Sequence, residues 1–230
     1  MGKGKFHRGL IFCNGEFSPE DVPAVRETDL VICADGGLGH ARAVGLTPHV
    51  VLGDFDSLKS ADQKYLHSHR GTIEVFQYPA EKDKTDGQLA VEYALDAGVQ
   101  EIWIFGALGG RIDHTLGNIL LGRLCIDRGV ALWLVGHRQH VCMLRGPTEA
   151  LVKGSPKDYV SLLPLTTTAS GVTTAGLYYP LQEATLYLGE TRGLSNELTG
   201  NTGKVEVKDG TLLVVRTNRD EGNHTTGHSR

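Results

Sequence analysis

The sequence predicts an α/β protein whose doubly wound, mostly parallel sheet is followed by a small all-β sandwich domain. Up to Val135, short apolar runs alternate with segments of helical periodicity, as in an open sheet with helices between successive strands. Several runs are apolar throughout, which is typical of strands buried on both faces of a parallel sheet. After about residue 137 the segments become short, β-branched and separated by turn residues, which favours a sandwich or barrel.

The first part contains six expected strands and at least two helices. The strands lie at 9–13, 30–34, 50–52, 73–76, 101–105 and 130–135. One helix begins after Thr85, because Thr85 and Gln88 form a T-x-x-Q capping box, and it ends at Gly98. A second helix is stopped by Gly129, and its apolar residues are Leu116, Ile119, Leu120 and Leu124.

The second part carries a hairpin signal and ends in a polar tail. In VEVKDGTLLVV, Asp209 and Gly210 separate two strands and supply the positive φ angles of a type I′ turn. The final residues are polar and lack periodicity, which predicts a disordered tail. The expected divisions are therefore residues 1–137, 138–218 and 219–230.

The composition excludes several classes of protein. A net charge of −4 gives no indication of nucleic-acid or membrane binding, and no apolar stretch approaches membrane-spanning length. The start of the chain lacks a signal-peptide cleavage pattern. The four cysteines form no C-x-x-C pair, so we expect free buried thiols and a cytoplasmic location. They are Cys13, Cys33, Cys125 and Cys142.

Aspartates follow four of the expected strands, at the points where those strands end. They are Asp35, Asp54, Asp56, Asp83, Asp86 and Asp113. Ligands of open α/β sheets bind at the carboxyl ends of the strands, so these side chains converge on one rim. Crowded carboxylates repel one another unless a cation compensates, and Mg²⁺ prefers carboxylate and phosphate oxygens. The pattern predicts a magnesium and phosphate site.

Each part of this pattern also has a simpler interpretation. The D-x-D of Asp54 and Asp56 alone is typical of a solvated loop, and Asp35 begins what can be a plain strand-to-helix turn. Asp86 can be a favourable charge in the first turn of its helix. Arg111 can clamp a phosphate or form a surface salt bridge. The coincidence of four loops favours the metal site over these separate explanations.

Other motifs give weaker signals. Glycines precede two helices and let the backbone approach phosphates at helix N-termini; they are Gly36, Gly37, Gly109 and Gly110. The sequence contains no P-loop, no dinucleotide fingerprint and no G-x-S-x-G elbow. His40, His67, His69 and His114 lack metal-ligand spacing, so we interpret them as ordinary surface or helix histidines.

Five motifs stand together in a recognisable order. They are CADGG (33–37), GDFDSL (53–58), DKTD (83–86), GGRIDHTLGN (109–118) and TRGLSNEL (191–198). From about residue 8 to 217 the chain resembles the thiamine pyrophosphokinase (thiamine diphosphokinase) family, especially its bacterial members. The resemblance implies a catalytic, nucleotide- and metal-binding domain at 1–137 and a thiamine-binding β-sandwich at 138–218. It also implies a homodimer that holds thiamine between the two kinds of domain.

The resemblance also assigns roles to residues. Catalytic roles fall to Asp54, Asp56 and Asp86, and these three hold Mg²⁺ together with Asp35. The ATP-binding residues it implies are Asp35, Gly36, Gly37, Asp83, Lys84, Thr85, Gly110, Arg111 and Asp113. The thiamine pyrimidine would contact Ser195 and Asn196. His40 stands where many relatives carry Asn and receives no role.

The activity implied is transfer of the diphosphoryl group of ATP to the hydroxyethyl oxygen of thiamine. AMP leaves and thiamine diphosphate forms, with aspartate-held Mg²⁺ stabilising the charge that develops. Asp86 can also accept or orient the hydroxyl proton, a role that the sequence does not separate from metal binding. Two alternatives remain: a metal-dependent phosphotransferase or phosphohydrolase with another acceptor, and a non-catalytic thiamine or nucleotide sensor. The TRGLSNEL segment argues against the first, and the full set of aspartates argues against the second.

Overall fold

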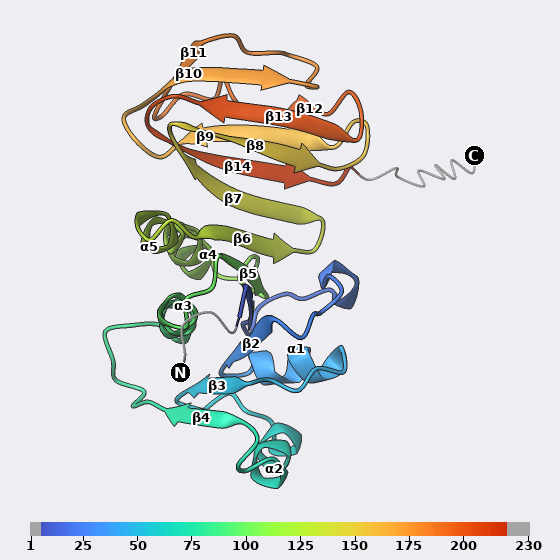
Figure 1. Ribbon diagram of the computed structural model, residues 1–230, viewed down its shortest axis with the longest axis vertical. Helices are drawn as coiled ribbons and strands as arrows, with labels where there is room; N and C mark the ends of the chain where they lie inside the picture. The colour runs from blue at the N-terminus through green and yellow to red at the C-terminus, as the bar shows by residue number, and fades with distance from the viewer. Residues whose placement is uncertain (1–5, 220–230) are drawn as a thin grey trace, which may run out of the picture.

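The computed structural model describes residues 6–219, which form two sheets that share one elongated body (Figure 1). The larger sheet has ten strands in the order β12-β9-β14-β7-β6-β5-β1-β2-β3-β4, and the smaller has four in the order β11-β10-β13-β8. Strands β1 to β6 are mutually parallel, and the pairings from β6 to β12 are antiparallel. This mixed sheet with a second antiparallel sheet confirms the predicted fold class.

The six strands of the α/β half lie within about a residue of the predicted positions. They are β1 (Arg8–Phe12), β2 (Asp29–Ala34), β3 (Val50–Gly53), β4 (Glu74–Gln77), β5 (Glu101–Phe105) and β6 (Ala131–Gly136). The agreement has a simple cause. Strands β1, β2 and β3 are buried along their whole length, so their sequences are apolar except for Arg8 and Asp29, which form a buried ion pair at the start of β1 and β2.

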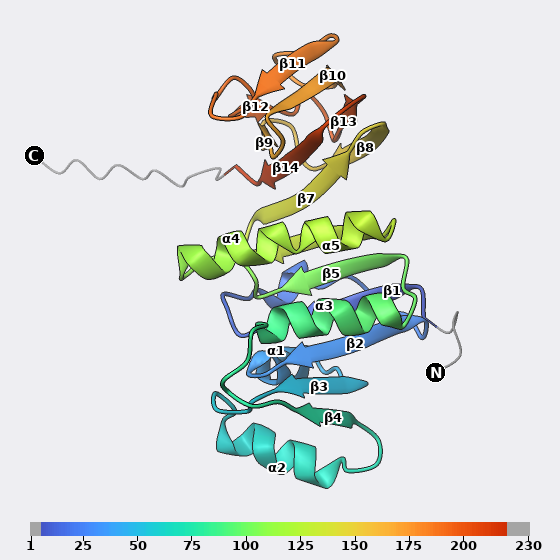
Figure 2. The same cartoon turned by 90° about the vertical axis from the view of Figure 1, so that its left-hand side faces the viewer.

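Helices cover both faces of this half (Figure 2). They are α1 (Gly37–Ala43), α2 (Ser60–Ser68), α3 (Asp86–Asp96), α4 (Ile112–Leu120) and α5 (Gly122–Asp127), with a short 3₁₀ helix, η1, at Pro19–Asp21. The helix predicted from its apolar residues near Leu120 is thus two helices, which meet at Leu121.

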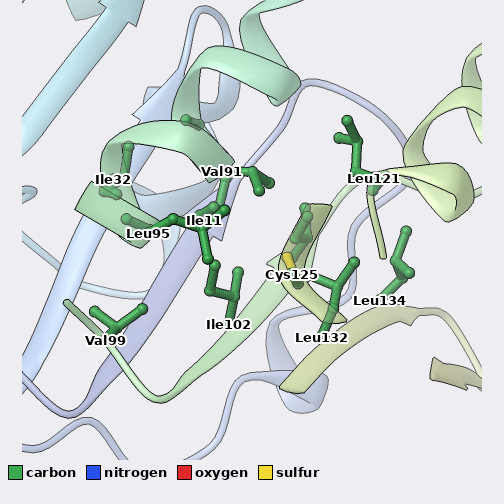
Figure 3. Packing of buried hydrophobic residues seen from close by; sticks show 14 of the residues in the cluster. Ile11, Ile32, Val91, Leu95, Val99, Ile102, Leu121, Cys125, Leu132 and Leu134 are labelled. Atoms are coloured by element: carbon green, nitrogen blue, oxygen red, sulfur yellow. The ribbon is translucent and has the colours of Figure 1, made fainter. Parts of the chain in front are cut away.

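Alternating side chains of the central strands feed two cores. Ile11 and Ile32 point to the face covered by α3 and α5, where they pack with Val91, Leu95 and Cys125 (Figure 3). The neighbouring strand residues point to the opposite face, under α1 and α2; they include Leu10, Phe12, Val31 and Cys33. Each fully buried aliphatic side chain stabilises the fold by roughly 1.5–3 kcal/mol.

The cap of α3 is only partly as predicted. The Thr85 hydroxyl accepts a hydrogen bond from the Gln88 N–H at 3.2 Å, which is the expected N-cap interaction. The Gln88 amide does not return to Thr85. It donates to Glu92 at 3.0 Å, so the reciprocal half of the capping box is wrong.

The second half is entirely β-structure within the described residues. Its strands are β7 (Gln139–Arg145), β8 (Thr148–Lys153), β9 (Tyr159–Pro164), β10 (Thr168–Ala175), β11 (Ala184–Tyr187), β12 (Asn196–Glu197), β13 (Thr202–Val207) and β14 (Thr211–Thr217). The small sheet packs on the β7, β9 and β14 part of the large one around a third core, which includes Val160, Leu162, Val172, Val205 and Leu212. This arrangement is a sandwich.

The predicted hairpin at Asp209 and Gly210 is wrong. Strand β13 pairs with β8 and β10 in the small sheet, whereas β14 pairs with β7 and β9 in the large one. Gly210 has a φ of 91°, but Asp209 has no positive φ, so the turn is not type I′. It carries the chain from one sheet to the other, because both strands bury one face in the same core.

The two halves are joined within one continuous sheet and not by a linker. The boundary predicted at residue 137 falls in the tight turn between β6 and β7, which pair with each other, and the division into domains stays a prediction. The tail predicted at 219–230 lies outside the described residues except for Arg219. All four cysteines are free, as predicted. No helix in residues 6–219 is long and apolar enough to cross a bilayer.

Candidate active site

A cleft of about 850 Å³ opens at the carboxyl ends of the parallel strands, between the segments that follow β1, β4 and β5. It lies beside β1. The chain runs from β1 through β2 and β3 to β4 on one side of β1 and then crosses to β5 on the other side. Ligands of open α/β sheets bind at such a switch in strand order. Among the predicted site residues, those that line it are Asp35, Asp83, Lys84, Thr85, Asp86, Gly110 and Arg111. Cys13, Asn14, Glu16 and Lys82 also line it and were missed.

Three of the predicted metal ligands form a compact carboxylate cluster. Asp35, Asp54 and Asp56 each present an oxygen within 4.8 Å of the others. Asp35 follows β2 directly with a φ of 48°, and its N–H donates to the Leu52 carbonyl at 2.8 Å. The left-handed backbone at Asp35 and the sheet bond to β3 therefore bring the ends of two strands together.

Electrostatics within the cluster are unequal. The Asp56 N–H donates to Asp54 Oδ1 at 3.1 Å, and this hydrogen bond is the main reason that the pKa of Asp54 lies below its ordinary value. The Asp54 charge in turn raises the pKa of Asp56. Repulsion of this kind is relieved when a cation binds between the carboxylates.

Asp35 supplies the strongest indication of a cation site. Its Oδ2 accepts a hydrogen bond from the Ser57 hydroxyl, whereas its Oδ1 is buried and has no hydrogen-bond partner among residues 6–219. A carboxylate oxygen can only accept, and leaving a buried acceptor unsatisfied costs about 1–3 kcal/mol. An acceptor-only oxygen beside two other carboxylates fits a hard divalent cation.

Lys82 occupies the space between this cluster and Asp86. Its ammonium lies 3.2 Å from Asp86 Oδ1 and 3.5 Å from Asp54 Oδ2, and it donates to the Pro79 carbonyl at 3.2 Å. Burial lowers the pKa of Lys82, but the two carboxylates outweigh burial and its pKa is raised. Burial is also the main reason that the pKa of Asp86 is raised, against the opposing effect of Lys82.

Asp86 is therefore next to the cluster without belonging to it in this structure. The signal that would have found Lys82 is the sequence EKDKTD, in which the lysine stands four residues before Asp86. Lysines in acidic loops are common, so this spacing alone indicates little.

The paired glycines after β2 have a steric role. A Cβ on Gly37 would overlap the Phe12 carbonyl, and a Cβ on Gly36 would lie 2.5 Å from the Asn14 side chain. Both glycines therefore let α1 pack closely against the end of β1. Neither lines the cleft, and their predicted contact with ATP stays a prediction.

The loop after β5 places Arg111 at the mouth of the cleft. Its guanidinium holds both carboxylate oxygens of Asp113, at 3.1 and 2.5 Å, and both side chains are largely exposed. Asp113 does not line the cleft. The simpler interpretation weighed for Arg111, a surface salt bridge, thus describes what the arginine does in this structure.

Ser195 and Asn196 lie far from the cleft, at the outermost strand of the same sheet. Asn196 Oδ1 accepts from the N–H groups of Tyr179 and Glu197, each at 2.9 Å, and its Nδ2 donates to the Tyr179 carbonyl at 2.7 Å. Ser195 has a φ of 56°, and its N–H donates to the Ser161 hydroxyl at 3.0 Å. The Asn196 amide thus holds a loop in place.

Comparisons with known proteins agree with this architecture. Residues 23–134 match the family model described as the catalytic domain of thiamin pyrophosphokinase, and residues 150–212 match that of its vitamin B1 binding domain. A thiamine pyrophosphokinase of Bacillus subtilis is 33% identical over 190 residues, which cover 83% of this chain and 88% of the relative. The chain belongs to the thiamin pyrophosphokinase family.

Solved structures of the family share the fold. The crystal structure of the thiamine pyrophosphokinase from Bacillus subtilis matches with a TM-score of 0.81 at 29% identity. The match covers 93% of this chain and 100% of the chain in that structure. That from Geobacillus thermodenitrificans has a TM-score of 0.78 at 29% identity, covering 94% and 99%. The predicted family and enzyme class are confirmed.

Proposed function

We propose that this chain transfers the diphosphoryl group of ATP to the hydroxyethyl oxygen of thiamine in the cleft beside β1, giving thiamine diphosphate and AMP. Its membership of the thiamin pyrophosphokinase family supports this reaction. The single observation that supports this location is the unsatisfied, buried Asp35 Oδ1 within a cluster of three carboxylates. A binding protein without chemistry has no need of that arrangement.

Asp35, Asp54 and Asp56 are the residues that would hold Mg²⁺, with Asp86 joining them if the Lys82 ammonium turns away. When bound, Mg²⁺ supplies positive charge that stabilises the developing charge on the transferring and leaving phosphates. The chain prepares for this by fixing two ligands in advance: Ser57 holds Asp35 Oδ2, and the Asp56 N–H holds Asp54.

Lys82 and Asp86 supply the remaining chemistry at this end of the cleft. The Lys82 ammonium neutralises two carboxylates in the absence of ligands and is within reach of a transferring phosphate once it turns. Asp86, whose pKa is raised mainly by burial, is suited to accept or orient the proton of the thiamine hydroxyl.

The nucleotide would lie along the rest of the cleft. Asp83, Lys84 and Thr85 line it from the segment before α3, and Gly110 and Arg111 line it from the segment before α4. Arg111 matches the bidentate geometry of a phosphate, so binding of the triphosphate would exchange the Asp113 carboxylate for phosphate oxygens. The loss of that exposed pair costs little.

A second copy of the chain would complete the acceptor side. In one chain, six strands separate β12 from β2, and strands lie about 4.8 Å apart, so Ser195 and Asp35 are on the order of 30 Å apart. One molecule of thiamine cannot touch both. We therefore propose a homodimer in which Ser195 and Asn196 of one copy approach the cleft of the other.

Two exposed apolar patches support the dimer. On α4, next to Arg111, Ile112, Leu116 and Leu120 are 76%, 53% and 58% exposed. Near Ser195, Tyr178 and Tyr179 are 64% and 65% exposed. Contiguous exposed apolar surface marks interaction sites, and each patch lies beside one half of the proposed active site.

The reaction is tested by its products. A single-turnover mixture of enzyme, ATP, Mg²⁺ and thiamine is expected to give AMP and thiamine diphosphate in equal amounts. The products are identified by phosphorus NMR or chromatography. ADP with thiamine monophosphate would instead show a transfer of the γ-phosphoryl group and contradict the proposal. Nucleotide consumption without any thiamine product would favour a phosphohydrolase.

A further inference from the structure

Within residues 6–219, the His40 side chain makes one hydrogen bond and one ring-stacking contact, and both are to the same short segment. Its Nδ1 lies 2.9 Å from the Cys13 carbonyl oxygen, and because a carbonyl can only accept, Nδ1 carries the proton and donates. Its ring stacks on Phe17 with centroids 4.6 Å apart and planes at 10°. Burial lowers the pKa of His40, so the neutral ring makes these contacts at neutral pH.

The segment between the two contacts, residues 13–17, is here called the β1-exit segment. Four of its five residues line the cleft. Its other side is hydrogen-bonded to the end of β5. The Cys13 N–H donates to the Phe105 carbonyl at 2.8 Å, and the Gly15 N–H donates to the Gly106 carbonyl at 2.9 Å. The segment is thus clamped between β5 and the His40 side chain, with its inner surface facing the nucleotide cleft.

The β1-exit segment also reaches the carboxylate cluster. Asn14 Nδ2 donates to the Ser57 hydroxyl at 3.4 Å, and that hydroxyl donates to Asp35 Oδ2. The Asn14 side chain has little freedom, because it lies against Gly36 so closely that a Cβ there would be 2.5 Å away. The position of the backbone at Cys13 therefore sets where Asn14 meets Ser57, and Ser57 sets the orientation of Asp35.

We propose that His40 is a positioning residue of the nucleotide and metal site, which holds the β1-exit segment so that Asn14 and Ser57 orient Asp35. The inference rests on the proposed function of the cleft. His40 touches neither the cluster nor the cleft in this structure. It acts through the segment alone, so its loss weakens the binding of ATP and Mg²⁺ without removing a ligand.

The two contacts of His40 are separable by substitution. His40→Asn keeps a donor close to the Nδ1 position and loses the aromatic ring, whereas His40→Phe keeps the stacking ring and loses the donor. The chain offers a matched control in His69, whose ring stacks on Tyr65 at 4.0 Å and whose Nδ1 lies 2.9 Å from the Tyr65 carbonyl oxygen. His69 follows α2 and does not line the cleft.

The experiment is calorimetric binding of ATP with Mg²⁺, together with the Mg²⁺ concentration for half-maximal activity and thermal melting. One lost hydrogen bond of about 1–1.5 kcal/mol corresponds to roughly tenfold, so His40→Phe is expected to weaken ATP binding and raise the Mg²⁺ requirement about tenfold. His40→Asn should retain most of both. His69→Phe should change neither, although both phenylalanine variants are expected to melt somewhat lower.

The proposal is overturned if His40→Phe binds ATP and Mg²⁺ as the unsubstituted chain does, or if His69→Phe weakens them equally. If His40→Phe does not fold, Asn14→Ala tests the same network from its other end and has to raise the Mg²⁺ requirement. The binding measurements do not depend on product formation. An unsubstituted chain that binds Mg-ATP but forms no thiamine diphosphate would therefore contradict the proposed function and leave the role of His40 to be judged separately.

Discussion

The carboxylate cluster and the Asn196 loop are opposite in how fully their polar groups are satisfied. In the cluster, Asp35 Oδ1 is buried and has no hydrogen-bond partner within residues 6–219, and Asp54 raises the pKa of Asp56. In the loop, the Asn196 amide makes three hydrogen bonds, two of them to Tyr179. The first region has the electrostatics of a site that awaits a cation, and the second has those of a rigid support. We therefore predict that the carboxylates of the cluster bind a ligand directly and that the Asn196 amide shapes the surface around one.

Removing a carboxylate from the cluster is expected to have the largest effect. Asp54→Asn and Asp56→Asn should abolish turnover, because metal affinity is lost. In the metal-free protein, Asp56→Asn should keep or raise the melting temperature, because the repulsion by Asp54 is relieved. Asp54→Asn should lower it slightly, because the ionised Asp54 accepts the Asp56 N–H and pairs with Lys82. Steady-state turnover at saturating Mg²⁺ and thermal melting check both parts. Near-normal turnover in either variant would show that these aspartates do not hold the metal.

Replacing Lys82 tests the interior of the same region. Lys82→Met is expected to lower turnover roughly 10²-fold, as for loss of one group that stabilises the transition state. It should also lower the metal-free melting temperature by roughly 2–4 °C, the shift for about 1 kcal/mol in a chain of this size. Added Mg²⁺ should reduce the difference in melting temperature between Lys82→Met and the unsubstituted chain.

Lys204→Met is the matched control for Lys82. Lys204 forms an ion pair with Glu149 at 2.5 Å in the β half, and neither residue has a proposed role in the reaction. Its substitution should leave turnover unchanged. A loss of turnover equal to that of Lys82→Met would mean that charge alone, and not the position of Lys82, is responsible.

Substitution of Asn196 is expected to affect the stability of the fold more than the rate of the reaction. Asn196→Ala leaves the N–H and C=O groups of Tyr179 without their partner, so we expect a loss of about 2–3 kcal/mol in the free energy of unfolding. Ser195→Ala removes no hydrogen bond that holds the loop and should leave stability unchanged while raising the KM for thiamine. Denaturant unfolding and thiamine kinetics separate the two variants, and unchanged stability in Asn196→Ala would refute the support role.

The pH dependence of stability should differ in sign between the two halves. Burial raises the pKa of Asp86, so its contribution to stability is present below the ordinary pKa and lost as pH rises through the raised value. Asp158, in the β half, is the reverse. Burial raises its pKa, but the N–H groups of Ser155 and Arg219 and the Arg216 side chain outweigh burial and lower it. Its contribution is present above the ordinary pKa and lost as pH falls through the lowered value.

Substitution by Asn makes this difference measurable, and it is the smallest effect expected. At pH 7 without metal, Asp86→Asn should raise the melting temperature and Asp158→Asn should lower it. Both differences should shrink as the pH approaches 3. Melting curves across this range check the signs, and a shared sign at pH 7 would mean that one of the two pKa directions is wrong.

The sequence predicts the positions of the strands and of the aspartates at their ends better than it predicts which strands or side chains pair with one another. Strands such as 30–34 are found because burial on both faces demands continuous apolar residues. The Asp209–Gly210 hairpin fails because a local turn signal does not say which sheet each flanking strand joins. The exposure of Leu116 and Leu120 is also invisible in sequence, since an apolar helix face looks the same whether this chain or another copy covers it.

The candidate site shows the same limit. Asp35, Asp54 and Asp56 are found because strand ends must share a rim, a rule that acts on sequence order alone. Lys82, Asn14 and Ser57 depend on side-chain directions that follow only from packing. The role in thiamine binding that the motif implies for Asn196 stays a prediction, and the structure shows its amide bonded to Tyr179.

The distance between Ser195 and Asp35 along one sheet has a genetic consequence. Under the proposed dimer, each active site takes its metal side from one copy and its acceptor side from the other. A chain inactive at Asp54 and a chain inactive at Ser195 would then complement each other. Random mixing of the two would restore about a quarter of the sites, because half of the dimers are mixed and each of these has one intact site. Two loss-of-function alleles of this gene, expressed together, would give enzyme activity that neither gives alone.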